Sequence, residues 1–218
     1  MTGSATIAYS GAGVPLWTNG GGTAIAVDGS GNVFVTGSAT IAYSGAGIPL
    51  WTNDYEGSGN GLALAVDGSG NVFVTGYSYG VMFSKHYATI AYSGTGVPLW
   101  TNPYDGEAHA VAVDGRGNVF VTGSSYGASG YDYATVAYSG AGVPLCTNRN
   151  NGTGKPSLAI GSDGAVYVAG TSEDGLFPSD FVTTKYVWQT ELAIRLLPTV
   201  PPKVKLTLSG APNSSWAV

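Results

Sequence analysis

The sequence predicts an all-β fold built from repeated four-stranded antiparallel sheets, and three observations carry this prediction. A twelve-residue motif occurs four times, the last time in altered form, and a fifteen-residue motif alternates with it. The apolar runs inside both motifs span four to seven residues and are rich in Val, Ile, Tyr, Phe and Thr. Glycine-containing turns bound these runs, which is typical of short strands and not of helices.

The first motif reads AVDGSGNVFVTG and contains two short apolar runs separated by DGSGN. Asp, Gly and Asn favour tight turns, because Gly adopts positive φ and Asx side chains bond to nearby backbone groups. The motif therefore predicts a β-hairpin. Its first strand is apolar on both faces, as expected for a strand buried between two neighbouring sheets. The copies lie at residues 26–37, 65–76, 112–123 and 159–170.

The second motif reads ATIAYSGAGVPLWTN and predicts another hairpin, which turns at SGAG. Its proline stands at the start of the second strand. Because proline has no N–H to donate, that strand is expected at the outer edge of its sheet. Successive copies are spaced by 34, 49 and 46 residues, and periods in the forties with four strands per period predict a β-propeller. The copies lie at residues 5–19, 39–53, 88–102 and 134–148.

The shortest spacing decides which strands share a sheet. Only Gly37 and Ser38 separate VFVT from the following ATIAY. Two residues close a tight hairpin but cannot cross between sheets, so these two strands must be neighbours. Complete blades are then expected at 23–53, 62–102 and 109–148, with an outer half-blade at 5–19, an inner pair at 157–170 and a third strand at 181–188. The incomplete ends either close a ring of about four to five blades or mark an arc of a larger propeller.

The stretch YATIAYSGTGVPLWTNPYDGEAHAVAVDGRGNVFVTG resembles the repeat of the bacterial seven-bladed β-propeller family, known as SBBP repeats. Its AVDGxGNVFV core is also similar to NHL repeats. The resemblance covers roughly residues 5–188 and rests on several copies. It implies a part of a large extracellular or cell-surface bacterial protein, although this chain has fewer blades than a closed ring of seven.

The C-terminal part departs from the repeat. Residues 1–188 are expected to form the propeller repeats, and residues 189–218 a linker followed by a truncated segment. PTVPP is typical of a stiff linker. ELAIRLL is expected to be either a helical turn or the missing outer strand of the last blade. Because Met1 lies almost directly on a repeat unit, the chain is expected to be a piece of a longer protein.

Composition excludes several function classes. Eight Lys and Arg against 13 Asp and Glu give a net charge of −5, and such sparse basic residues make no nucleic-acid surface. No apolar run approaches the length of a membrane span. The single cysteine, Cys146, forms no disulfide within the chain and is interpreted as a small buried hydrophobe.

Function is expected where the repeats differ, and one such place precedes the first strand of a blade. His109, with Glu107 and Asp105 close by, is the candidate for proton transfer or metal binding at the mouth of the central channel. The competing interpretation is a solvated loop histidine. Recurrent acidic residues, Asp28, Asp67 and Asp114, are weak metal candidates, because their D-G-x-G-N spacing resembles part of a calcium loop but is also typical of ordinary Asx turns.

The insertions between the second and third strands of a blade differ in length and sequence. They are rich in Tyr, Ser and Gly, and tyrosine offers a large contact area at low entropy cost. Loops on a rigid scaffold often carry binding residues. The candidates are Tyr79, Met82, Phe83, His86, Tyr126 and Tyr131.

Three recurrent tryptophans, Trp17, Trp51 and Trp100, occupy the outer strands, with Cys146 in the fourth place. Stacked tryptophans can bind sugars or cations. Regular recurrence favours packing between blades instead, because a large aromatic side chain fills space efficiently.

The sequence therefore favours a non-enzymatic binding or display module of a secreted or cell-surface bacterial protein, which contacts a protein or glycan through its variable loops. The alternative is a propeller lyase or hydrolase with a metal-assisted site at the channel mouth. No cofactor, nucleic acid or membrane span is predicted, and open blade edges could allow self-association.

Overall fold

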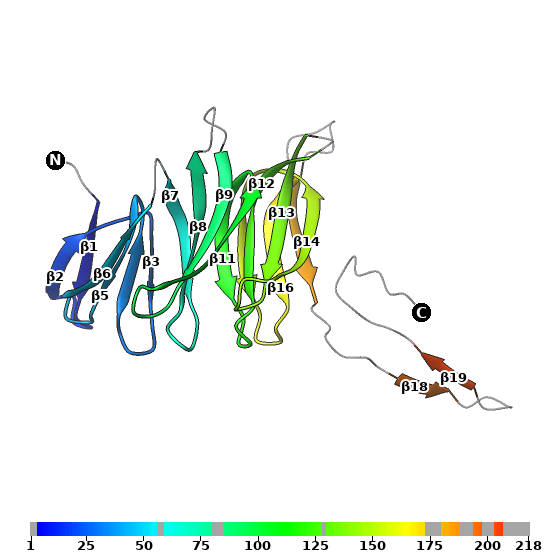
Figure 1. Cartoon of the computed structure of the whole chain (residues 1–218), viewed down its shortest axis with the longest axis horizontal. Coiled ribbons are helices and arrows are strands. Elements are labelled where there is room, and N and C mark those ends of the chain that lie inside the picture. Colours follow the sequence, from blue (N-terminus) through cyan, green and yellow to red (C-terminus); the bar gives the residue numbers. More distant parts are fainter. Residues whose placement is uncertain are drawn as a thin grey trace.

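The computed structural model describes residues 4–55, 59–79, 85–127, 130–172, 180–187, 194–197 and 203–206. All regular elements in these ranges are β-strands, and their sheets stand side by side along the chain (Figure 1). The described residues include no helix that is long and apolar enough to span a membrane.

Blade 1 is a four-stranded antiparallel sheet in which sequence neighbours pair. Its strands are β3 (Ala24–Val27), β4 (Val33–Thr36), β5 (Ala39–Tyr43) and β6 (Pro49–Asp54). β6 begins at Pro49 and lies at the edge of the sheet, as the missing N–H of proline predicts.

Blades 2 and 3 repeat this order with longer strands. Blade 2 consists of β7 (Asn60–Val66), β8 (Val72–Tyr79), β9 (Lys85–Tyr92) and β10 (Pro98–Asp105). Blade 3 consists of β11 (Glu107–Val113), β12 (Val119–Gly127), β13 (Gly130–Tyr138) and β14 (Pro144–Asn151). The phase that the sequence predicts for the three complete blades is therefore confirmed.

The two ends of this array are incomplete blades. β1 (Ala5–Tyr9) and β2 (Pro15–Gly20) form the N-terminal half-blade, and β15 (Thr153–Ile160), β16 (Val166–Ser172) and β17 (Asp180–Tyr186) form the three-stranded blade 4. Each pairs only within its own sheet among the described residues. The described blades thus form an open array of propeller blades, and the expected ring closed by the two incomplete ends is not found among them.

Two further strands lie beyond blade 4 in the sequence. β18 (Ile194–Leu197) and β19 (Lys203–Leu206) pair with each other in an antiparallel sheet. The expectation that ELAIRLL is either a helical turn or the outer strand of the last blade is therefore wrong for residues 194–197. The PTVPP segment, residues 198–202, lies outside the described residues.

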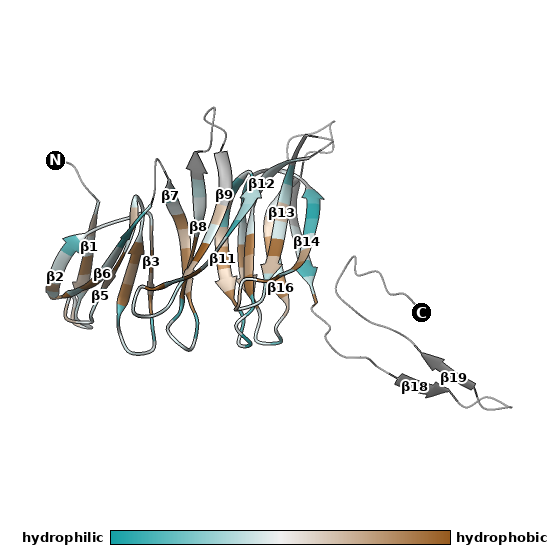
Figure 2. Cartoon of the chain, in the orientation of Figure 1, coloured by the Kyte–Doolittle hydropathy of each residue, from teal (hydrophilic) through white to brown (hydrophobic). Residues whose placement is uncertain are grey.

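Neighbouring blades pack face to face. Aliphatic side chains of one blade contact alanine and aromatic side chains of the preceding blade. Between blades 1 and 2, Leu64 and Val66 of β7 pack against a buried cluster that includes Phe34 of β4. Equivalent apolar clusters join blade 2 to blade 3 and blade 3 to blade 4. Hydrophobic residues form a band across the middle of the strands, and hydrophilic residues gather toward their ends (Figure 2). The apolar inner strands predicted from the sequence are thus stacked against one another.

The recurrent tryptophans connect consecutive blades, as the sequence predicts. Trp51 on β6 lies beside Phe34 of its own blade and Tyr92 of blade 2, with ring centroids 5.9 Å apart in both pairs. Its Nε1 donates a hydrogen bond of 3.0 Å to the carbonyl oxygen of Gly94 in the β9–β10 turn. Trp17 and Trp100 make the same contacts with Gly45 and Gly140. These three tryptophans are therefore structural.

Candidate functional site

The strands of blade 2 extend beyond those of blade 1. Only Gly37 and Ser38 connect β4 to β5, and these strands contain 4 and 5 residues. β8 and β9 each contain 8 residues because the second repeat carries an insertion at this place. Part of the blade 2 face that is turned toward blade 1 is therefore left uncovered.

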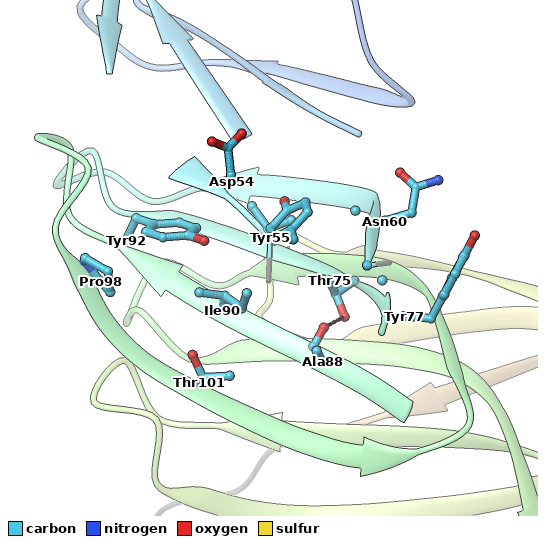
Figure 3. A pocket seen from close by; sticks show the side chains of 14 residues that line it. Asp54, Tyr55, Asn60, Thr75, Tyr77, Ala88, Ile90, Tyr92, Pro98 and Thr101 are labelled. Carbon is cyan, nitrogen blue, oxygen red and sulfur yellow. Dashed lines mark hydrogen bonds between the residues drawn. The ribbon is translucent and has the colours of Figure 1, made fainter. Parts of the chain in front are cut away.

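A cleft of about 390 Å³ lies at this step between blades 1 and 2 (Figure 3). Val74, Ala88 and Ile90 of blade 2 form an apolar floor. Three tyrosines and four further polar side chains also line the cleft: Tyr55, Tyr77, Tyr92, Asp54, Asn60, Thr75 and Thr101. An apolar surface with a few polar groups at its margin is the usual composition of a small-ligand site.

Tyr55 forms one wall of the cleft and is fixed by the end of blade 1. Its hydroxyl lies 2.6 Å from Oγ1 of Thr36 and 2.5 Å from Oγ1 of Thr40. These threonines are fully buried, so their hydroxyls need partners within the protein. Burial is the main cause that raises the pKa of Tyr55, which stays neutral in the physiological range. Tyr55 therefore ties the end of β6 to the buried threonines of its own blade.

Tyr92 also lines this cleft and is buried. Burial, with a smaller contribution from the nearby Tyr55, raises its pKa to about 12. Among the described residues of the lining, Asp54 is the one acidic side chain, and neither His nor Cys occurs. General acid–base catalysis works best with a group whose pKa lies near the working pH. With a pKa of about 12, Tyr92 does not meet this condition.

The predicted channel-mouth residues lie at the junction of blades 2 and 3. Asp105 ends β10 and Glu107 begins β11. His109 lies where the β11–β12 register shifts between Ala108 and Ala110, and its Nε2 is 3.5 Å from Oγ of Ser124. β7 has the same irregularity next to Leu62, so the bulge belongs to the repeat and does not depend on histidine.

No group of three His, Cys, Asp or Glu side chains that could hold a metal ion occurs in the described part of the chain. The aspartates of the D-G-x-G-N turns are already engaged within their own turns. Oδ1 of Asp67 accepts hydrogen bonds of 2.8 Å from the backbone N–H groups of Ser69 and Asn71, and its Oδ2 accepts one of 2.8 Å from Nδ2 of Asn71. Asp28 and Asp114 repeat these bonds. Turn formation accounts for the recurrence of these residues.

The pKa of Asp28 reflects the same turn geometry. Partial burial acts to raise this pKa, but hydrogen bonds from Asn32, Ser30 and Gly31 outweigh burial and leave it below the ordinary value. The carboxylate form is thus stabilised by donors within the turn.

Some of the predicted loop residues lie among the residues that the structure describes. Tyr126 lies on β12 and is 71% exposed, which suits a contact residue. The backbones of Tyr79, His86 and Tyr131 lie on strands β8, β9 and β13. His86 stands opposite Asp105 in the β9–β10 register. Met82 and Phe83 lie outside the described residues.

The cleft residues were not predicted from the sequence. Asp54 and Tyr55 follow the second WTN, Tyr77 begins the insertion of the second repeat, and Tyr92 ends the recurrent ATIAY segment that follows it. The available signal was the absence of that insertion from the first repeat. The missing insertion indicates a cleft only when blades 1 and 2 are known to lie face to face.

Comparisons with known proteins support the fold alone. The chain is similar to a protein of unknown function from Bacteroides caccae, with 14% identity and a TM-score of 0.53 over 77% of this chain and 65% of that one. Weaker likenesses are BamB from Moraxella catarrhalis (13% identity, TM-score 0.33, 72% and 58% coverage) and an ACO/RPE65 chimera (10%, 0.43, 77% and 46%). The chain spans less than two thirds of each.

No family model and no curated protein matches the chain. The chain belongs structurally to the all-β proteins with propeller blades. Membership of the SBBP repeat family stays a prediction from sequence resemblance.

Proposed function

We propose that the chain is a non-enzymatic binding module of a secreted or cell-surface bacterial protein, and that the cleft between blades 1 and 2 binds a neutral saccharide. The observation that carries this proposal is the tyrosine-lined cleft of about 390 Å³ at the step between the two blades. The extracellular setting rests on the resemblance to SBBP repeats.

The chemistry of the lining supports a saccharide. Sugars combine apolar ring faces with hydroxyl groups, and the cleft combines an apolar floor and tyrosines with the side chains of Asp54, Asn60 and Thr101. The Asp54 carboxylate and the net charge of −5 disfavour anionic sugars.

The test is an array of neutral and anionic glycans, followed by titration calorimetry with the strongest ligand. Asn60→Ala and Asp54→Asn should each weaken binding by about tenfold, the size expected from the loss of a buried hydrogen bond. Tyr126→Ala is the matched control, because that exposed tyrosine lies on blade 3, and it should leave the affinity unchanged.

Two outcomes would contradict the proposal. If Tyr126→Ala abolished binding and the cleft variants did not, the loops alone would carry the interaction. If only peptides bound, the saccharide assignment would be wrong. The alternative, a lyase or hydrolase at His109 and Glu107, requires that turnover disappear in His109→Ala.

A further inference from the structure

The tyrosine that forms one wall of the cleft recurs at the next junction between blades. Tyr55 and Tyr104 are each the second residue after WTN, at the ends of the outer strands of blades 1 and 2. Burial, with a smaller contribution from Tyr55, raises the pKa of Tyr92, and burial with Tyr104 does the same for Tyr138. Each wall tyrosine therefore lies near the same tyrosine of the following blade, and the two occupy equivalent places.

At the junction of blades 2 and 3, a guanidinium group lies beside this tyrosine. Cζ of Arg149 is 5.7 Å from the ring centroid of Tyr104. Its Nη2 donates hydrogen bonds of 3.0 Å to the hydroxyl of Tyr104 and of 3.1 Å to Oγ of Ser125. Nη1 lies 3.6 Å from Oδ2 of Asp132, whose side chain is only 13% exposed. A tyrosine, a hydroxyl and a carboxylate thus bind this arginine, as expected for a planar cation with several N–H donors.

Arg149 reaches this place from the outer strand of blade 3, and blade 2 has no arginine at the corresponding position. Arg149 stands opposite Ala134 in the β13–β14 register. In blade 2 the equivalent pair is Pro103 opposite Ala88, and Ala88 lines the cleft. The cleft between blades 1 and 2 therefore corresponds to the place that Arg149 occupies between blades 2 and 3.

The cleft presents groups that suit a guanidinium ion. Tyr55 takes the place of Tyr104, and the carboxylate of Asp54 lies in the lining beside it (Figure 3). The apolar floor, which includes Ala88 and Ile90, offers contact for methylene groups, and an arginine side chain buries its methylene groups along apolar surface. The net charge of −5 favours the approach of a cation.

We propose that the cleft between blades 1 and 2 binds a guanidinium group at Asp54 and Tyr55, and that an arginine side chain of a protein partner supplies it. A protein source is favoured because the equivalent group between blades 2 and 3 is itself a protein side chain. Lysine fits less well, because its compact ammonium group is strongly hydrated and does not pair bidentately with a carboxylate. The proposal goes beyond the saccharide, which needs no charge, and the two ligands should compete for the cleft.

Titration of the intact chain with the capped tripeptide Ala-Arg-Ala, followed by NMR chemical shifts, tests the proposal. Binding should saturate at millimolar concentration. The same peptide with citrulline, which has the shape of arginine but no charge, should bind more weakly by about tenfold or more. Asp54→Asn should weaken binding of the arginine peptide by about tenfold. Asp67→Asn is the matched control, because it makes the same change of charge in the β7–β8 turn, at the other end of β7 from the cleft, and it should leave the affinity unchanged.

Two further variants test whether the two junctions are equivalent, and circular dichroism verifies that each one folds. Pro103→Arg places an internal guanidinium group where blade 3 has Arg149, and it should abolish peptide binding, whereas Pro103→Ala should bind like the parent chain. Arg149→Ala should open a second site of the same kind between blades 2 and 3. Agmatine, a small guanidinium cation, should therefore raise the melting temperature of Arg149→Ala by about twice as much as that of the parent chain.

Three results would overturn the proposal. They are equal binding of the arginine and citrulline peptides, unchanged binding in Asp54→Asn, and unchanged binding in Pro103→Arg. Tighter binding of the peptide than of agmatine would support a protein partner, whereas tighter binding of agmatine would overturn that source and identify a small cation as the ligand. The saccharide proposal is tested with neutral glycans and with Asn60→Ala, which should leave the arginine peptide unaffected, so either proposal can fail without the other.

Discussion

Gly96 lies against the indole ring of Trp51, with a backbone φ of +83° and a Cβ position that would fall 2.7 Å from ring atoms. Nδ2 of Asn53 donates a hydrogen bond of 2.8 Å to the carbonyl oxygen of Gly96. The pairs Gly47–Trp17 and Gly142–Trp100 have the same geometry. Each WTN segment thus contacts the SGxG turn of the next blade through its tryptophan ring and binds it through a hydrogen bond from its asparagine.

Replacing this glycine should destabilise the array. Gly96→Ala places a methyl group against Trp51 and also strains a left-handed backbone, so we expect a loss of about 2–4 kcal/mol in the free energy of unfolding. Urea unfolding followed by tryptophan fluorescence measures it. Gly68→Ala is the control, because a Cβ there meets no atom within 4 Å, and it should change stability by less than about 1 kcal/mol. Equal stability of the two variants would contradict the proposed contact.

The D-G-x-G-N turns should be insensitive to calcium. Asp67→Ala removes three hydrogen bonds from the β7–β8 turn and should cost about 1–3 kcal/mol. Ser69→Ala should be nearly neutral, because Ser69 contributes its backbone N–H to this turn. Millimolar calcium should shift the melting temperature of the parent chain by less than about 1 °C, since ligand binding would stabilise the folded state. A larger shift that Asp67→Ala abolishes would instead establish a metal site.

Alkaline pH should destabilise the blade interfaces through two tyrosines. Burial, assisted by Tyr55, raises the pKa of Tyr92 to about 12, and burial, assisted by Tyr104, does the same for Tyr138. Because the folded pKa values exceed the ordinary value of 10.0, the stability that these groups contribute is complete below pH 10. It is lost as the pH rises toward 12, by up to about 1.4 kcal/mol per pH unit for each tyrosine.

Urea unfolding between pH 8 and pH 11.5 checks this expectation. The double variant Tyr92→Phe and Tyr138→Phe keeps both rings but cannot ionise at these positions, so its stability should fall less steeply above pH 10. Identical slopes for the parent chain and the double variant would assign the alkaline loss to other groups.

Restoring the repeat sequence on blade 4 should allow copies of the chain to associate head to tail, because the exposed Ile25 and Val27 of blade 1 form an apolar surface at the other end of the array. Tyr167→Phe with Lys185→Ala removes the ion pair to Asp163 and recreates the apolar surface of blades 1 to 3. We expect concentration-dependent assembly in light scattering, because two complementary ends on one chain generate head-to-tail contacts. Addition of Ile25→Lys should reverse it. A triple variant that assembles as strongly as the double one would exclude β3 from that contact.

Much of the fold follows from local patterns in the sequence. The D-G-x-G-N and SGxG turns close between residues only a few positions apart, and alternation along each strand fixes which side chains share a face. The two residues between β4 and β5 required these strands to pair, and the structure confirms it. ELAIRLL was misinterpreted because its partner, KVKL, follows a segment that resembled a linker.

The candidate sites depended more strongly on tertiary structure. His109, Glu107 and Asp105 were noticed because their residue types differ between repeats. The cleft containing Tyr55 and Asn60 was missed because it arises from a difference in length between two sheets, and each contributes only part of its wall. Residue type alone gave no indication of this difference.

The sequence by itself determined the strands, their order within each blade and the contact between tryptophan and the next blade, because all of these repeat with the motif. Only the tertiary structure decided where the repetition fails: the step beside Tyr55, the exposed Ile25 and Val27, and the Lys185–Asp163 pair at the opposite end. The physical reason is that a blade becomes buried only through its neighbour, so exposure depends on which sheets meet and how far each extends.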